Sequence, residues 1–156
     1  MEKFQITKQG YEKLRAEVEN LKNARPKIIQ AIAEARDHGD LKENVEYHAA
    51  RERQGLIEAM LSDLEDKLSR SEVVDISNLS GDKVKFGATV KLENLDNGKI
   101  VTYKIVSDYE ANIDDGMISS FSPVARGLID KMVGDEIEIN TPGGVSNYEI
   151  IEIKFS

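Results

Sequence analysis

The sequence predicts an α+β protein in which an N-terminal antiparallel α-helical coiled-coil hairpin precedes a small antiparallel sheet with one short helix. Two observations support this prediction. Two separate stretches each carry a 3.5-residue apolar repeat, and beyond residue 83 the period changes to the alternation and turn residues of short strands. We therefore expect a coiled-coil domain at 1–75, a linker at 76–82 and a sheet domain at 83–156.

Composition limits what the chain can be. Its net charge is −8, which argues against holding duplex nucleic acid by bulk electrostatics. It has no cysteine, which excludes a disulfide framework and a thiolate zinc site. No apolar run approaches the roughly 20 residues that span a bilayer, and residues 1–10 lack the apolar core of a signal peptide. We expect a cytoplasmic protein without a membrane segment.

The first helix is predicted to begin after Thr7, a plausible N-cap. Pro26 removes a backbone donor and tends to bend a helix. The apolar row nevertheless stays in phase across the proline, so one continuous helix is predicted. The row has Arg25 as its one polar member and otherwise consists of Tyr11, Leu14, Val18, Leu21, Ile28, Ile32 and Ala35.

The second helix carries a matching row and is predicted to run to about Ser71. Two adjacent helices with matching stripes and a short polar connection pack antiparallel. At 1.5 Å per residue, helices of about 30 residues form a rod of about 45 Å. The charged remainder of both helices predicts that this rod projects from the protein. The second row consists of Tyr47, Ala50, Gln54, Ile57, Leu61, Leu64 and Leu68.

The turn at residues 37–44 is polar, with acids at Asp37, Asp40 and Glu43. One interpretation is structural, with Asp40 as the N-cap of the second helix and Glu43 completing a capping box. The other is functional, because the turn holds more negative charge than capping requires and stands at the end of the rod. Mg²⁺ takes six oxygen ligands, so two carboxylates bind it weakly alone. They could complete a shell whose other ligands come from a partner and substrate phosphates.

Other candidate groups near the turn give weaker signals. His38 and His48 have no third ligand at metal spacing and are interpreted as surface histidines. Arg36, Arg51 and Arg53 could contact RNA phosphates, although charged flanks of coiled coils commonly look the same. The chain has no phosphate-binding glycine loop.

The second half reads as short strands separated by turns. Asp96-Asn97-Gly98 is a hairpin signal, and Ser122-Pro123 has the N-cap and N1 signature of a short helix. Strands are expected at 84–92, 100–106, 117–120, 136–140 and 148–155, with an acidic loop at 108–116, the helix at 124–131 and a turn at 142–144.

Four segments, in this order and spacing, resemble the GreA/GreB family of bacterial transcript cleavage factors, and the sparse basic residues near the turn resemble its GreA branch. The likeness covers nearly the whole chain and implies an FKBP-like fold for the C-terminal domain. The segments are ARDHGDLKENVEYHAARERQGLIE at 35–58, FGATV at 86–90, SPVARGLI at 122–129 and TPGG at 141–144.

The resemblance implies a transcription elongation factor that binds RNA polymerase, passes its coiled coil into the secondary channel and stimulates the polymerase's own cleavage of backtracked RNA. The factor is then an accessory protein rather than an enzyme, and a monomer when free. Phe121 stands where the family pattern has Asp or Asn. The implied roles are catalysis and shared Mg²⁺ binding for Asp40 and Glu43, contact with the nascent RNA 3′ end for Arg36 and Arg51, and polymerase binding for Ser119, Ser122 and Pro123.

Three alternatives remain open. A non-cleaving regulator of the secondary channel would use the same rod without promoting cleavage. A peptidyl-prolyl isomerase would need a deep aromatic pocket, and the chain has no tryptophan. A coiled-coil adaptor whose turn is only a capping box predicts that Asp40→Asn and Glu43→Gln leave function intact.

Overall fold

The computed structural model describes residues 2–37, 44–75 and 81–155. These residues form two compact units. The first comprises 11–37 and 44–71, and the second comprises 2–10, 72–75 and 81–155. The second unit thus includes residues 2–10 and 72–75, which the sequence alone placed with the helices.

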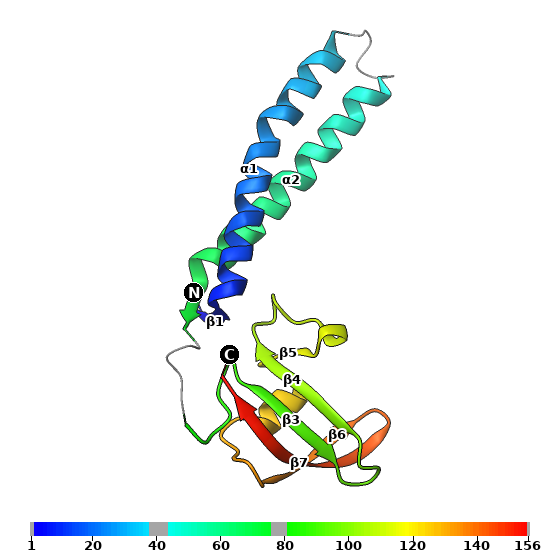
Figure 1. Ribbon diagram of the computed structural model, residues 1–156. Helices are drawn as coiled ribbons and strands as arrows, with labels where there is room; N and C mark the ends of the chain where they lie inside the picture. The colour runs from blue at the N-terminus through cyan, green and yellow to red at the C-terminus, as the bar shows by residue number, and fades with distance from the viewer. Residues whose placement is uncertain (1, 38–43, 76–80, 156) are drawn as a thin grey trace. The chain divides into compact units, whose positions relative to one another are not determined.

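The first unit is a pair of antiparallel helices, α1 (Lys8–Arg36) and α2 (Val45–Arg70), drawn side by side in Figure 1. Every member of the two predicted rows is buried or half-buried, as the 3.5-residue repeat predicts. The buried members are Leu14, Val18, Ile28, Ile32, Ala35, Ala50, Leu61 and Leu64.

The middle of the hairpin confirms the continuous first helix. Pro26 lies inside α1, which does not end there. Arg25, the polar member of the row, donates from Nε and Nη2 to the Glu58 carboxylate at 2.7 and 3.0 Å. The hydrogen bond that Arg25 donates to Glu58, followed by the negative charge of Glu58, raises the pKa of Arg25. A polar residue is tolerated in the row because it pairs across the two helices.

A two-stranded sheet is formed by one strand before α1 and one strand after α2 in sequence. Strand β1 (Phe4–Thr7) pairs with β2 (Ser71–Val74), and neither strand was predicted. Ile6 of β1 is fully buried. The Thr7 hydroxyl accepts a hydrogen bond from the Gly10 amide at 3.1 Å, which confirms Thr7 as the cap of α1.

The second sheet has five strands in the order β5-β4-β3-β7-β6. Both predicted hairpins are present, β3–β4 and β6–β7. Ser122 caps α3 and Pro123 is its first residue, as predicted. The elements are β3 (Thr89–Asn94), β4 (Ile100–Val106), the 3₁₀ helix η2 (Ile113–Asp115), β5 (Met117–Ser119), α3 (Pro123–Leu128), β6 (Glu136–Thr141) and β7 (Gly144–Lys154).

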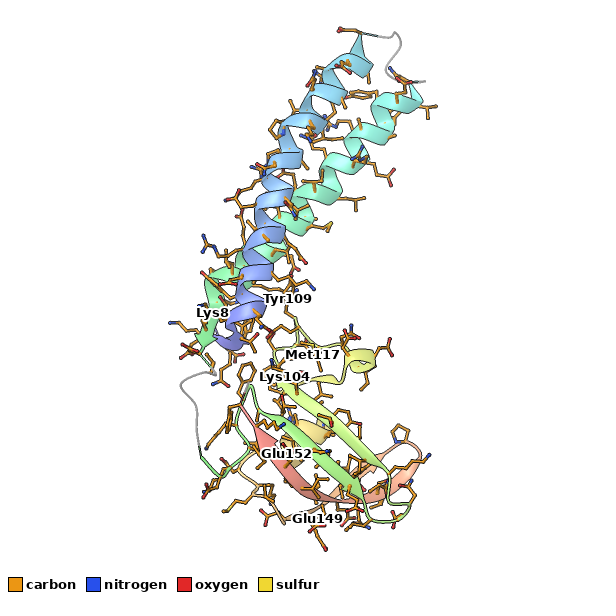
Figure 2. The ribbon with its side chains drawn as sticks, viewed as in Figure 1. Lys8, Lys104, Tyr109, Met117, Glu149 and Glu152 are labelled. Atoms are coloured by element: carbon orange, nitrogen blue, oxygen red, sulfur yellow. The ribbon has the colours of Figure 1, made fainter. Side chains whose placement is uncertain are left out.

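The predicted fully antiparallel sheet is wrong at one edge. Strand β5 runs parallel to β4, with Lys104 opposite Met117, and both side chains are labelled in Figure 2. The segment between them includes η2 and an isolated bridge from Asn112 to Met117, so the chain turns back before β5 begins. A parallel pair requires such a crossover rather than a tight turn.

Three predicted element boundaries are also wrong. The final strand, expected from residue 148, already begins at Gly144. The strand expected from residue 84 begins only at Thr89, after Gly87 with a φ of 88°. The helix expected to reach residue 131 ends at Leu128, and Asp130 follows with a φ of 67°. The Asp130 amide donates to the Val84 carbonyl oxygen at 2.9 Å. This hydrogen bond joins the end of the helix to the segment before β3.

The core of the second unit lies on one face of the five-stranded sheet, where α3 packs (Figure 1). Alternating residues of β3, β4, β6 and β7 point into it, and the opposite face carries polar residues such as Thr89, Lys91 and Thr102. No helix in the described part of the chain is long and apolar enough to cross a membrane. The core residues are Val84, Phe86, Ala88, Val90, Leu92, Ile105, Ile118, Ala125, Leu128, Ile137, Ile139 and Ile150.

Candidate functional site

The first candidate region is the end of the hairpin where α1 stops and α2 begins. Asp40 and Glu43, the predicted catalytic and metal-binding acids, lie outside the described residues, as do Gly39 and His38. The structure does describe the residues on either side of them. These are Arg36 in the last turn of α1, Asp37 directly after it, and Asn44 before the first turn of α2.

Asn44 connects the two helices at this end. Its side-chain Oδ1 accepts a hydrogen bond from the Tyr47 amide at 3.0 Å, which makes Asn44 the N-cap of α2. Its Nδ2 donates to the carbonyl oxygen of Ala35 in α1. The predicted N-cap at Asp40 is therefore wrong for α2, which begins at Val45. Asp40 and Asn44 are both residue types that cap helices. Because α2 begins at Val45, Asn44 is its N-cap.

One arginine from each helix lies at this end of the hairpin. Arg36 is the last residue of α1, and its guanidinium carbon lies 5.8 Å from the centre of the Tyr47 ring. Arg51 is exposed and follows Tyr47 by four residues, so the two share a face of α2. A cation over an aromatic ring is held by the ring's quadrupole. Tyr47 thus orients Arg36, a role that its place in the apolar row did not reveal.

No group of three acidic, histidine or cysteine side chains that could hold a metal ion occurs among residues 2–37, 44–75 and 81–155. Asp37 is exposed. Carboxylates are the ligands that Mg²⁺ prefers, so Asp40 and Glu43 have the right donor chemistry. Two carboxylates supply fewer oxygens than the six that Mg²⁺ takes, so they could not complete its shell alone.

The second candidate region is the turn at residues 119–123, in the other unit. It brings together all three predicted polymerase-binding residues. Ser119 ends β5, and its Oγ accepts from the Phe121 amide at 3.1 Å while its carbonyl oxygen accepts from the Ser122 amide at 2.9 Å. Ser122 Oγ accepts from the Ala125 amide at 3.2 Å. Exposed Pro123 begins α3. Internal hydrogen bonds therefore hold the turn in one conformation.

A hollow of about 190 Å³ lies beside this turn. Phe121, 60% exposed, forms part of its lining. The remaining lining comes from β1 with the residue before it and from the residues directly after β4 and β5. The other lining residues are Lys3, Phe4, Gln5, Ser107, Asp108 and Ser120.

Sequence reasoning missed a cluster around Glu110. The Glu110 carboxylate accepts hydrogen bonds from the Thr7 amide at 3.2 Å and from the Thr7 hydroxyl. It also accepts from the Ser107 amide at 3.2 Å and the Ser107 hydroxyl at 2.8 Å. Thr7 and Ser107 are both buried polar residues, so this carboxylate satisfies them. Glu110 lies 103 residues from Thr7, and no local pattern indicates such a pair.

Comparison with known proteins covers both units. Residues 4–73 match the family model described as "Transcription elongation factor, N-terminal". Residues 79–155 match "Transcription elongation factor, GreA/GreB, C-term". A protein of Phenylobacterium zucineum named transcription elongation factor GreA is 51% identical over 156 residues, with 99% of each chain covered. A protein of Brucella suis with the same name is 53% identical over 156 residues, again with 99% of each covered.

Solved structures of similar proteins were also found. The GreA factor homolog 1 (Gfh1) of Thermus thermophilus is 29% identical, with a TM-score of 0.45 and 97% of this chain and 99% of that chain covered. A GreA/GreB elongation factor from Nitrosomonas europaea is 24% identical, with a TM-score of 0.45 and 98% and 100% covered.

Proposed function

Because the chain belongs to the GreA/GreB family of transcription elongation factors, we propose that it binds RNA polymerase, inserts its helical hairpin into the secondary channel and stimulates cleavage of backtracked nascent RNA. The observation that carries this proposal is the match of both halves of the chain to the family. It is reinforced by 51% and 53% identity to relatives named GreA over 156 residues. The protein is an accessory factor, and the hydrolysis takes place in the polymerase's active site.

Asp40 and Glu43 act in this proposal as carboxylates donated to the polymerase. The capping of α2 by Asn44 supports this role, because α2 does not require Asp40 as its N-cap. The two acids hold no metal stably in the free protein and share Mg²⁺ with the polymerase. Mg²⁺ bound there would polarise a phosphoryl oxygen and lower the pKa of a coordinated water. The two carboxylates orient that water toward the scissile phosphodiester.

Arg36 and Arg51 contact the 3′ segment of the backtracked RNA. Both are exposed, and they come from different helices at the same end of the hairpin. Guanidinium groups recognise phosphate oxygens through paired hydrogen bonds. Arg36 is already positioned over Tyr47, so it loses less side-chain freedom on binding RNA than an unconstrained arginine would.

The turn that contains Ser119, Ser122 and Pro123 docks on the polymerase. The hydrogen bonds within the turn support this assignment, because a preorganised surface avoids much of the entropy lost when a flexible loop binds. The free factor is a monomer in this proposal, and each polymerase takes one copy.

The test is RNA cleavage in stalled, backtracked polymerase complexes with Mg²⁺ present. The Asp40→Asn, Glu43→Gln double variant is compared with the unaltered protein at concentrations where both saturate the polymerase. We expect the cleavage rate to fall by at least about 100-fold, because positioned acids of this kind typically contribute 10²–10⁴-fold. Binding, measured separately, should change little.

A matched control is the Glu46→Gln, Glu52→Gln variant, which also neutralises two acids, both exposed on the first two turns of α2. Its cleavage rate should remain near that of the unaltered protein. If the Asp40→Asn, Glu43→Gln variant cleaves as fast as the unaltered protein, the proposal that these carboxylates are donated to the polymerase is refuted. Binding without any cleavage by the unaltered protein would support the non-cleaving regulator instead.

A further inference from the structure

Two arginines of the first helix are held in different ways, and the difference decides which of their donors are used. Arg25, in the middle of α1, donates from Nε and Nη2 to the Glu58 carboxylate at 2.7 and 3.0 Å. Arg36, the last residue of α1, instead has its guanidinium carbon over the Tyr47 ring, 5.8 Å from the ring centre. A contact with the face of a ring uses none of the five N–H donors of a guanidinium.

The Tyr47 ring is itself held in place by α2 and by the end of the hairpin core. The Tyr47 amide donates to Asn44 Oδ1 at 3.0 Å, which fixes the first turn of α2. Because the ring is half-buried and close-packed, it offers the guanidinium a fixed surface. The buried residues against which the ring packs come from both helices and are Ile28, Ile32 and Ala50.

The packing role of Tyr47 does not require an aromatic side chain. Apart from the polar Gln54, the later members of its row in α2 are all aliphatic. A leucine at position 47 would cover the same cluster of buried residues. An aromatic residue adds the negatively charged face of its ring, which attracts a cation. The row has this ring at its member nearest the end of the hairpin, where Arg36 lies.

The next step rests on the proposed contact between Arg36 and backtracked RNA. We propose that Tyr47 is a positioning residue for that contact, because its ring holds the Arg36 guanidinium and leaves the N–H donors for phosphate oxygens of the RNA. A carboxylate in place of the ring would occupy donors and offset the positive charge, as Glu58 does for Arg25. Tyr47 acts through Arg36 and needs no contact with RNA of its own.

The geometry can be tested in the free full-length protein by NMR. The Nε–Hε proton of Arg36 should resonate upfield of its position in an unstacked arginine, because it lies in the ring current of Tyr47. Tyr47→Leu should abolish this shift, whereas Tyr47→Phe should retain most of it, since phenylalanine also presents a ring face. An Arg36 resonance that does not move in Tyr47→Leu overturns the positioning role.

The contribution to RNA binding is tested by titrating backtracked polymerase complexes with each full-length variant. For Arg36→Gln we expect the concentration that gives half-maximal cleavage to rise about tenfold, because hydrogen bonds from a charged donor are lost. For Tyr47→Leu we expect a rise of about two- to fivefold, because the arginine remains but is no longer held by the ring. The affinity of both variants for polymerase without RNA should be unchanged.

A double variant and two controls separate positioning from packing. Tyr47→Leu should cause no further loss in the Arg36→Gln background, since the ring acts only through that guanidinium. Tyr47→Phe should cleave at the same concentrations as the unaltered protein. The matched control is Tyr11→Leu, the same change at another half-buried tyrosine, in the first turn of α1 at the opposite end of the hairpin. It should leave the half-saturating concentration unchanged.

The outcomes distinguish failure of the positioning role from failure of the proposed function. Tyr47→Leu that cleaves at unaltered concentrations while Arg36→Gln does not overturns the positioning role. An equal loss from Tyr47→Leu with and without Arg36, or Tyr47→Phe as weak as Tyr47→Leu, also overturns it and assigns Tyr47 to packing. Arg36→Gln without any effect refutes the RNA contact in the proposed function, and the positioning role falls with it.

Discussion

The side chain of Asn44 donates a hydrogen bond to the carbonyl oxygen of Ala35, nine residues earlier at the end of α1. The last four carbonyls of a helix and its first four amides lack partners within the helix. Asn44 satisfies one of each, because its Oδ1 also accepts from the Tyr47 amide of α2. The Asn44 side chain thus links the end of α1 to the start of α2.

Replacing Asn44 should therefore destabilise the hairpin. Asn44→Ala removes the cap and the bond to Ala35, and we expect the free energy of unfolding to fall by about 1–2 kcal/mol. Asn44→Asp keeps the acceptor for the Tyr47 amide but loses the donor to Ala35, so its loss should be smaller. Urea titrations followed by helical circular dichroism measure both. Equal stability of Asn44→Ala and the unaltered protein would contradict the capping role.

The contact between Gly10 and Glu110 predicts a coupled pair of substitutions. A Cβ built on Gly10 would overlap the carboxyl group of Glu110, which four hydrogen bonds from Thr7 and Ser107 hold in place. Glu110→Ala should lower the free energy of unfolding by about 2 kcal/mol or more, because hydrogen bonds to a charged group are lost. Gly10→Ala should also destabilise the protein.

In the Glu110→Ala background the same Gly10→Ala change should no longer destabilise. It should instead raise the free energy of unfolding by up to about 1 kcal/mol, because alanine is the better helix former. A double-mutant cycle of urea midpoints checks this coupling. Additive effects of the two substitutions would mean that the contact carries no energy.

Pro26 lowers the stability of α1 while leaving the helix continuous. It cannot donate to the carbonyl of Lys22, four residues earlier, and its ring crowds that turn. Pro26→Ala should raise the free energy of unfolding by roughly 2–3 kcal/mol. Thermal unfolding of the full-length protein provides the measurement, with exposed Ala33→Ser in the same helix as a control of small effect. A lower melting temperature for Pro26→Ala would show that the proline fits a bend that the fold requires.

Low pH should weaken the ion pair between Lys85 and Asp130, at the end of α3. Lys85 Nζ lies 2.8 Å from Asp130 Oδ1, and this hydrogen bond, followed by the charge of Lys85, lowers the pKa of Asp130 from 3.8. A lowered folded-state pKa contributes stability above pH 3.8 that disappears as the pH falls through the folded value. The difference in stability between the unaltered protein and Asp130→Asn should be constant from pH 7 to about 4 and shrink below it.

Asparagine is the suitable replacement in that test because Asp130 has a φ of 67°, a conformation that asparagine also adopts readily. Asp130→Ala should melt lower than Asp130→Asn at every pH, since alanine is strained there. Chemical denaturation at a series of pH values separates the backbone effect from the charge effect. A stability difference for Asp130→Asn that grows as the pH falls would have the wrong sign for this pair.

The helical half was predictable in detail because its signal is local. A 3.5-residue repeat identifies buried positions from spacing alone, so the prediction held even across Pro26 and the polar Arg25. Hairpin turns are local for the same reason, and both hairpins of the large sheet were anticipated. The motif around Asp40 and Glu43, with three C-terminal segments, was enough to indicate the family.

The sequence by itself determined the paired helices, both hairpins of the large sheet, the Ser122 cap with Pro123 at the start of α3, and the family. Only the tertiary structure decided that β5 runs parallel to β4, that Asn44 rather than Asp40 caps α2, and that Phe121 borders a hollow. The physical reason is that these features depend on where distant segments meet. Glu110 shows this most clearly, since its carboxylate has meaning only beside Thr7, 103 residues away, and no local window contains both partners.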